Sequence, residues 1–147
     1  MRESLLIYVV DDDADYRFLV QQVFRRFLPQ YSLRLFVDGL ALIHHMESSS
    51  TDSDGAHQTK ENPDQPGLIV LDVDMPRLNG FRTLERLKRN ASWNPIPVVL
   101  MSNRTEPGFE TAARALGAGS YLSKPMGVDQ LQTMMTQVCH HWLNGGG

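Results

Sequence analysis

Two apolar runs in this sequence end in aspartate, and these aspartates are the residues best suited to chemistry. The run Leu5–Val10 leads into Asp11–Asp13, and the run Leu68–Leu71 leads into Asp72. Short apolar runs rich in branched side chains are typical of buried strands. Ligands bind at the carboxyl ends of parallel strands in α/β proteins. If the two strands are neighbours, the sequence therefore predicts at least three carboxylates at one edge of a sheet.

A carboxylate cluster of this kind needs a counter-ion. Neighbouring carboxylates repel one another, and the repulsion raises their pKa values. Mg²⁺ is the hard, oxygen-seeking cation expected where phosphate chemistry takes place. Asp13 has a second interpretation, as the N-cap of a helix that begins directly after it.

Two further runs bring other functional groups to the same edge. The runs Ile96–Met101 and Ser120–Ser123 are also predicted to be strands, and they lead into Ser102 and Lys124. A phosphoryl group on an aspartate needs a cation, a hydroxyl donor and a metal. The four strand ends supply the cation, the hydroxyl and the carboxylates that could hold a metal around Asp72.

These strand ends resemble the receiver domain of two-component response regulators, of the stand-alone, chemotaxis-regulator-like kind. The spacings of 30 residues from Asp72 to Ser102 and 22 residues from Ser102 to Lys124 fit that family. The resemblance covers residues 4–143. The residues that carry it are Val9-Val10-Asp11-Asp12, Leu71-Asp72-Val73-Asp74-Met75-Pro76 with Asn79-Gly80, Ser102, and Tyr121-Leu122-Ser123-Lys124-Pro125.

The resemblance implies that Asp72 is a phosphoacceptor. It would take a phosphoryl group from a histidine of a kinase or a histidine phosphotransfer protein. Mg²⁺ would be held by Asp12, Asp72 and the backbone carbonyl of Asp74, with Asp11 supporting it through water. Lys124 would pair with a phosphoryl oxygen.

The resemblance also implies a switch. Ser102 would donate to the phosphoryl group, and the aromatic ring of Tyr121 would swing inward behind it. The face made by the predicted helix 107–116, the strand 120–123 and the helix 128–143 would then change its preferred downstream protein. In the family the Lys124–Pro125 peptide bond is cis, and the same is expected here. The kinase, the downstream protein and the oligomeric state are left open, a homodimer included.

The elements needed to position these groups alternate along the chain. Strands are predicted at 4–10, 31–37, 68–72, 96–102 and 120–123, with helices at 14–28, 40–46, 81–90, 107–116 and 128–143. Such alternation predicts a five-stranded parallel sheet covered on both faces. The fold class is therefore α/β, doubly wound (βα)₅ and flavodoxin-like, and 147 residues suit one receiver domain, residues 1–147.

One segment fits no element. Residues 48–67 are polar, rich in Ser, Gly and Pro, and without periodicity, which predicts a flexible loop. Two interpretations stay open for it, a tolerated surface insertion and a partner-binding loop. Residues 145–147 are three glycines and are expected to form a disordered tail.

Composition excludes several classes of function. With 14 Lys and Arg against 17 Asp and Glu, the net charge is −3, so direct nucleic-acid binding is not expected. One cysteine allows no internal disulfide and fits the cytoplasm. No apolar run is long enough to predict a membrane span. No residues remain for an enzymatic output domain, so a signalling protein is expected, not an enzyme.

Two other functions stay open at this point. The segment Asp72–Asp74 also matches the D-x-D motif of haloacid-dehalogenase-type phosphatases, which are hydrolases. Against that alternative stand the upstream pair Asp11–Asp12 and the position of the motif in the middle of the chain. A degenerate receiver that only binds partners is the second alternative, and the intact set of Asp12, Asp72, Ser102 and Lys124 argues against it.

Overall fold

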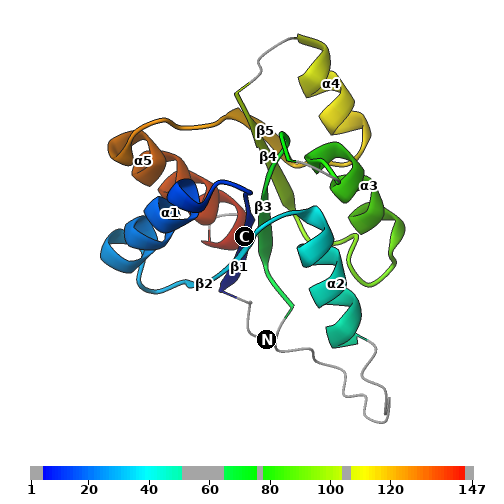
Figure 1. Ribbon diagram of the computed structural model, residues 1–147, viewed down its shortest axis with the longest axis horizontal. Coiled ribbons are helices and arrows are strands. Elements are labelled where there is room, and N and C mark those ends of the chain that lie inside the picture. Colours follow the sequence, from blue (N-terminus) through cyan, green and yellow to red (C-terminus); the bar gives the residue numbers. More distant parts are fainter. Residues whose placement is uncertain (1–4, 51–64, 76–77, 104–106, 145–147) are drawn as a thin grey trace.

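The computed structural model describes residues 5–50, 65–75, 78–103 and 107–144. Strands and helices alternate through these residues (Figure 1). They are β1 (Leu6–Val10), α1 (Ala14–Phe27), β2 (Ser32–Phe36), α2 (Gly39–Ser50), β3 (Leu68–Asp72), α3 (Gly80–Arg89), β4 (Val98–Ser102), α4 (Pro107–Ala115), β5 (Ser120–Ser123), α5 (Val128–Cys139) and a π-helical turn, η1 (His140–Asn144).

The five strands form one parallel sheet in the order β2-β1-β3-β4-β5. Figure 1 shows α1 and α5 on one face of the sheet, and α2, α3 and α4 on the other. Every residue of β3 and β4 is buried, because helices cover both faces of these central strands. The flavodoxin-like (βα)₅ prediction is confirmed, and β3 with its terminal Asp72 occupies the middle of the sheet.

Three predictions about the elements are wrong. Helix α2 continues to Ser50, into the predicted loop, because Leu42, Ile43 and Met46 bury one face and no helix breaker intervenes. The last turn predicted for the C-terminal helix is π-helical instead of α-helical. No cis peptide bond occurs among the described residues, so the Lys124–Pro125 bond is trans, the form that most X–Pro bonds adopt. Residues 51–64 of the predicted loop and the tail 145–147 lie outside the described residues.

Two helix starts follow from the residue at the N-cap. The Asp13 side chain accepts a hydrogen bond from the Asp15 backbone N–H at 3.0 Å, and the Asn79 side chain accepts one from the Arg82 N–H at 3.0 Å. Both caps satisfy backbone donors that the helix itself leaves free. The capping role proposed for Asp13 is thus confirmed, and it separates this residue from the two aspartates that precede it.

Apolar residues at helical spacing form one stripe along α1, which is buried except at its last position. Tyr16, Val20, Val23 and Phe24 are buried, whereas Phe27 is 42% exposed. The stripe faces the sheet together with buried residues of α5, including Cys139. None of the described helices is long and apolar enough to span a membrane.

Helix α4 is lightly packed. Ala113 is the one α4 residue that is buried, and Phe109 is half-buried. The helix ends in a Schellman motif, in which the Ala118 N–H bonds to the Ala113 carbonyl and the Gly117 N–H to the Arg114 carbonyl, both at 3.0 Å. Gly117 has a φ of 104°, which a residue without a side chain adopts readily.

A half-buried lysine lies against that turn. Lys88 of α3 donates through Nζ to the carbonyls of Asn94 and Ile96, both at 2.9 Å. A Cβ on Gly117 would come within 3.1 Å of the Lys88 side chain, so the aliphatic stem lies directly under the turn. Burial lowers the pKa of Lys88 from its ordinary value. The C-terminal end of α4 therefore rests on α3.

Candidate functional site

Asp72 stands at the carboxyl end of β3 with its side chain almost fully buried. Helix α3 begins close beside it, and the Gly80 N–H donates to the Val73 carbonyl at 3.0 Å. A Cβ on Gly80 would come within 2.6 Å of the Asp72 carbonyl oxygen. A glycine is required here because any side chain would push the start of α3 away from Asp72.

Three carboxylates meet at this edge of the sheet. Asp11, Asp12 and Asp72 each offer an oxygen, and these oxygens lie within 4.8 Å of one another. Asp11 is fully buried, whereas Asp12 is exposed. The structure thus brings together the carboxylates predicted from the two strand ends. The Asp74 carboxylate lies outside this group and accepts a hydrogen bond from the Ser102 hydroxyl at 3.2 Å.

Lys124 supplies the cation of the site. Its Nζ lies 2.7 Å from an Asp11 oxygen and 3.4 Å from an Asp72 oxygen. Its backbone N–H donates to the Ser102 carbonyl at 3.0 Å, which continues the β4–β5 pairing to the edge of the sheet. The ammonium is therefore nearer to Asp11 than to Asp72, an arrangement that the sequence did not predict.

Burial sets the electrostatics of the site. It raises the pKa of Asp72 to about 7, helped by the charge of Asp11 and opposed by Lys124. Burial also raises the pKa of Asp11, again opposed by Lys124. A single ammonium thus leaves the cluster short of positive charge. The donor set, oxygen only and with Asp12 open to solvent, fits a hard divalent cation such as Mg²⁺.

The predicted hydroxyl and aromatic residues lie on the next two strands. Ser102 ends β4 and is buried. Tyr121 on β5 is half-buried and stacks on Phe81 of α3, with ring centroids 6.5 Å apart. Phe81 in turn lies 5.9 Å from the ring of Phe109 on α4. These three rings connect α3, α4 and β5 beside the site.

Two residues of α1 contact the site in ways the sequence reasoning missed. The Tyr16 ring centroid lies 4.4 Å from Lys124 Nζ, and Arg17 Nη1 donates to the Asp11 backbone carbonyl at 2.8 Å. Tyr16 belongs to the apolar stripe of α1, and helical spacing by itself places it only in the core. Its position within the first turn after Asp11–Asp13 is the signal that could have placed it near the cluster.

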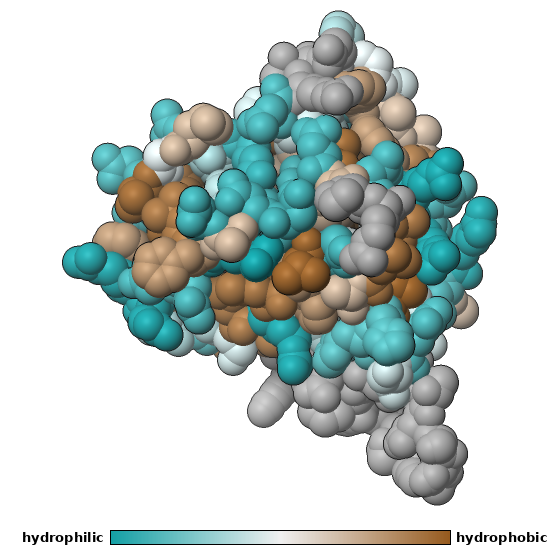
Figure 2. Space-filling view, in the orientation of Figure 1, coloured by the Kyte–Doolittle hydropathy of each residue, from teal (hydrophilic) through white to brown (hydrophobic). Residues whose placement is uncertain are grey.

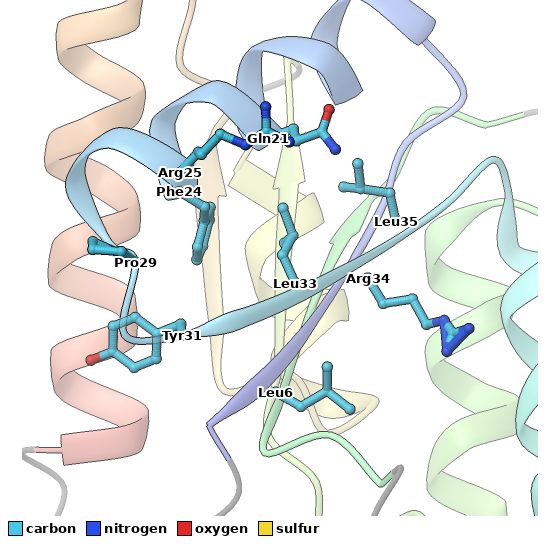
Figure 3. Close-up of a pocket in the computed structure, with 9 residues that line it drawn as sticks. All are labelled: Leu6, Gln21, Phe24, Arg25, Pro29, Tyr31, Leu33, Arg34 and Leu35. Atoms are coloured by element: carbon cyan, nitrogen blue, oxygen red, sulfur yellow. The ribbon is translucent and has the colours of Figure 1, made fainter.

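A groove between α1 and the edge strand β2 lies apart from this chemistry. Figure 3 shows Leu33 and Leu35 pointing toward α1 there, with Arg34 directed away. Figure 2 shows apolar surface between the two helical layers on this side of the molecule. The groove has no carboxylate in its lining and none of the predicted site residues.

The fold and the site together define the class of protein. It is a doubly wound parallel α/β protein with carboxylates, an ammonium and a hydroxyl at the carboxyl edge of its sheet. Residues 7–136 match the response regulator receiver domain, and the chain belongs to this family. It is thus a receiver domain of two-component signalling.

Individual relatives agree with this assignment. The response regulator Rcp1 of Synechocystis sp. is 28% identical over 140 residues, which cover 95% of this chain and 89% of Rcp1. Protein-glutamate methylesterase/protein-glutamine glutaminase 3 of Geobacter metallireducens is 37% identical over 142 residues, but the match spans only 35% of its length.

Solved structures show the same architecture. The Mn²⁺-bound form of Rcp1 matches with a TM-score of 0.74 and 25% identity, covering 94% of both chains. The phosphorylated cyanobacterial phytochrome response regulator RcpA matches with a TM-score of 0.76 and 20% identity, covering 97% of this chain and 94% of RcpA. The second likeness concerns the fold alone.

Proposed function

We propose that this receiver accepts a phosphoryl group on Asp72 and uses it to change a protein-binding face. The observation that carries the proposal is the position of Asp72, at the end of the central strand, inside the carboxylate group and 3.4 Å from Lys124 Nζ. In the reaction an Asp72 carboxylate oxygen attacks the phosphorus of a phosphohistidine. The P–N bond breaks, the imidazole leaves, and an aspartyl phosphate forms.

The residues around Asp72 bind the phosphoryl group and the metal ion. Lys124 pairs with a phosphoryl oxygen, and the Ser102 hydroxyl donates to another. Asp12, Asp72 and the backbone carbonyl of Asp74 would hold Mg²⁺, and Asp11 would support it through water. When bound, the ion offsets negative charge on the carboxylates and the phosphoryl group. The carboxylate grouping in this chain and the Mn²⁺-bound form of Rcp1 support this assignment.

The switch lies on the α4–β5–α5 face. Ser102 must leave the Asp74 carboxylate to reach a phosphoryl group on Asp72, and Tyr121 then moves inward from its stack on Phe81. The light packing of α4 supports this proposal because few buried contacts oppose its displacement.

The partners follow from the same chemistry. The phosphoryl donor is a histidine kinase or a histidine phosphotransfer protein, and the output is another protein bound by the switched face. We place the protein in the cytoplasm, with residues 1–147 forming one receiver domain that catalyses only its own phosphorylation and slow dephosphorylation.

Intact-mass measurement after incubation with acetyl phosphate tests the proposal. The wild-type protein should gain one phosphoryl group in Mg²⁺ and none in EDTA, and Asp72→Asn should gain none. Asp13→Asn is the matched control, because asparagine caps a helix as well as aspartate does and Asp13 lies outside the carboxylate group. Full labelling of Asp72→Asn would show that another residue is the acceptor.

The two alternative functions predict different results. A haloacid-dehalogenase-type phosphatase would release phosphate continuously from a small phosphoester, and membership of the receiver family argues against it. A binding-only receiver would gain no mass under any condition and would not bind beryllofluoride.

A further inference from the structure

Lys124 has a third partner besides the two carboxylates, and it is an aromatic ring. The ammonium lies 4.4 Å from the centroid of Tyr16, within the distance at which a cation is attracted to a ring face. The Lys124 side chain is only 12% exposed, so little water competes for this contact. Asp11, Asp72 and Tyr16 thus share one largely buried ammonium.

Tyr16 is itself held firmly. It is buried in α1, and its hydroxyl donates to the Met101 sulfur on β4 at 3.7 Å. Met101 is the register partner of Asp72 in the β3–β4 pair. Burial and the charges of Asp11 and Asp72 raise the pKa of Tyr16, so the phenol stays neutral and keeps its proton for this hydrogen bond. The ring therefore has little freedom to move, and it lies between α1 and the strands that carry the site.

An immobile ring can restrict the position of the Lys124 ammonium, which matters because a lysine side chain is flexible. Four rotatable carbons leave the ammonium free to follow its strongest partner, and Asp11 at 2.7 Å is closer than Asp72 at 3.4 Å. Asp11 is the nearer carboxylate even with the ring in place, and the ring limits how far the ammonium can move away from both carboxylates. With the ring present, the ammonium is restricted to the space that all three groups border.

We propose that Tyr16 is a positioning residue whose ring holds the Lys124 ammonium where it can pair with a phosphoryl group on Asp72. The inference rests on the proposed phosphoacceptor function. Tyr16 acts through Lys124 and touches no reacting atom. It differs from a core aromatic in that the ring face is needed, not merely its volume.

Substitutions separate the ring from the volume it fills. Tyr16→Phe keeps the ring face and loses only the bond to Met101, so phosphorylation by acetyl phosphate in Mg²⁺ should stay close to the wild-type rate. Tyr16→Leu removes the ring, and the rate should fall about twofold to thirtyfold, the range set by a partly to fully desolvated cation–π contact. Tyr16→Met is the second ring-free variant if Tyr16→Leu does not fold.

A control variant isolates the effect of Lys124. Phe24→Leu also removes a buried ring from α1 and from the same core, but Phe24 lines the groove between α1 and β2 that lies apart from the site. Its phosphorylation rate should stay at the wild-type value. Equal slowing of Phe24→Leu and Tyr16→Leu would overturn the inference, because it would mean that core packing alone matters.

An NMR measurement tests the contact without any phosphorylation. The ring current of Tyr16 should displace the Lys124 ε-methylene protons upfield, and the signal is assigned by its loss in Lys124→Arg. The displacement should persist in Tyr16→Phe and disappear in Tyr16→Leu or Tyr16→Met. Signals at the same place in all variants would overturn the inference.

The outcomes also distinguish this inference from the proposed function. If the wild-type protein takes no phosphoryl group, the proposed function fails and the inference fails with it. If the wild-type protein and the ring-free variants are phosphorylated at equal rates, only the role of Tyr16 is overturned.

Discussion

Asp72→Asn should make this receiver more stable at neutral pH when no divalent cation is present. Burial raises the pKa of Asp72 from 3.8 to about 7. At pH values between these two pKa values, the Asp72 carboxyl keeps its proton in the folded protein but has released it in the unfolded chain. The unfolded state binds fewer protons, so the free energy of unfolding falls as the pH rises through this window and is level above about pH 7.

The size of the effect follows from the pKa difference. About three pKa units correspond to roughly 4 kcal/mol in total, of which about 2.5 kcal/mol is lost between pH 5 and pH 8. Asparagine does not ionise and escapes this loss. Relative to the protonated carboxyl its amide costs about 1–3 kcal/mol at every pH, and a constant cost cancels when two pH values are compared.

The assay is urea unfolding of both proteins in EDTA at pH 5, 6, 7 and 8, with Trp93 and Trp142 as fluorescent probes. The stability of Asp72→Asn relative to wild type should increase by about 2.5 kcal/mol across the series. In saturating Mg²⁺ the increase should largely disappear, since the ion offsets the carboxylate charges of the wild-type site. A stability difference that stays constant from pH 5 to pH 8 in EDTA would refute the reasoning.

Three other outcomes are expected. Lys124→Ala should still gain phosphoryl mass, but beryllofluoride should no longer shift the NMR signals of the α4–β5–α5 face; wild-type shifts would remove its switching role. Gly80→Ala should lower the free energy of unfolding by about 1–3 kcal/mol in urea, because the added Cβ would meet backbone at 2.6 Å. In Gly108→Ala on α4 the added Cβ meets nothing within 4 Å, so the free energy of unfolding should rise by up to about 1 kcal/mol. Equal effects of the two substitutions would contradict this. The Cys139 thiol is buried and its pKa is raised to about 12, so it should react with a disulfide reagent only on unfolding; rapid labelling of the native protein would be incompatible with that burial.

Most of the site could be predicted because it is built from strand ends. A strand buried on both faces needs a continuous apolar run, and such runs stand out in the sequence. The first polar residue after each run must lie at the edge of the sheet. Asp11, Asp72 and Ser102 could therefore be placed together without knowledge of any side-chain conformation, whereas Lys124 follows β5, a shorter strand that is only partly buried.

What could not be predicted depends on how side chains turn. Tyr16 and Lys124 are 108 residues apart, and nothing in the helical period of α1 says that the ring would face an ammonium. The bond from Ser102 to the Asp74 carboxylate likewise depends on two rotamers. Phe27 keeps the period of the apolar stripe but lies in the last turn, where the core no longer covers it.

The two ends of α4 are held very differently, and this asymmetry gives the helix a pivot. Its C-terminal turn is closed by the hydrogen bonds of the Schellman motif and packs against the Lys88 side chain. Lys88 in turn donates hydrogen bonds to the carbonyls of Asn94 and Ile96. Its N-terminal end lies toward the β4 edge that carries Ser102. A displacement that begins at Ser102 should therefore rotate α4 about its C-terminal end, which stays in place, and move its N-terminal end the most. Amide exchange should become faster along the helix from Ala115 toward Gly108, so the switched face would be reshaped most at the end nearest the phosphate.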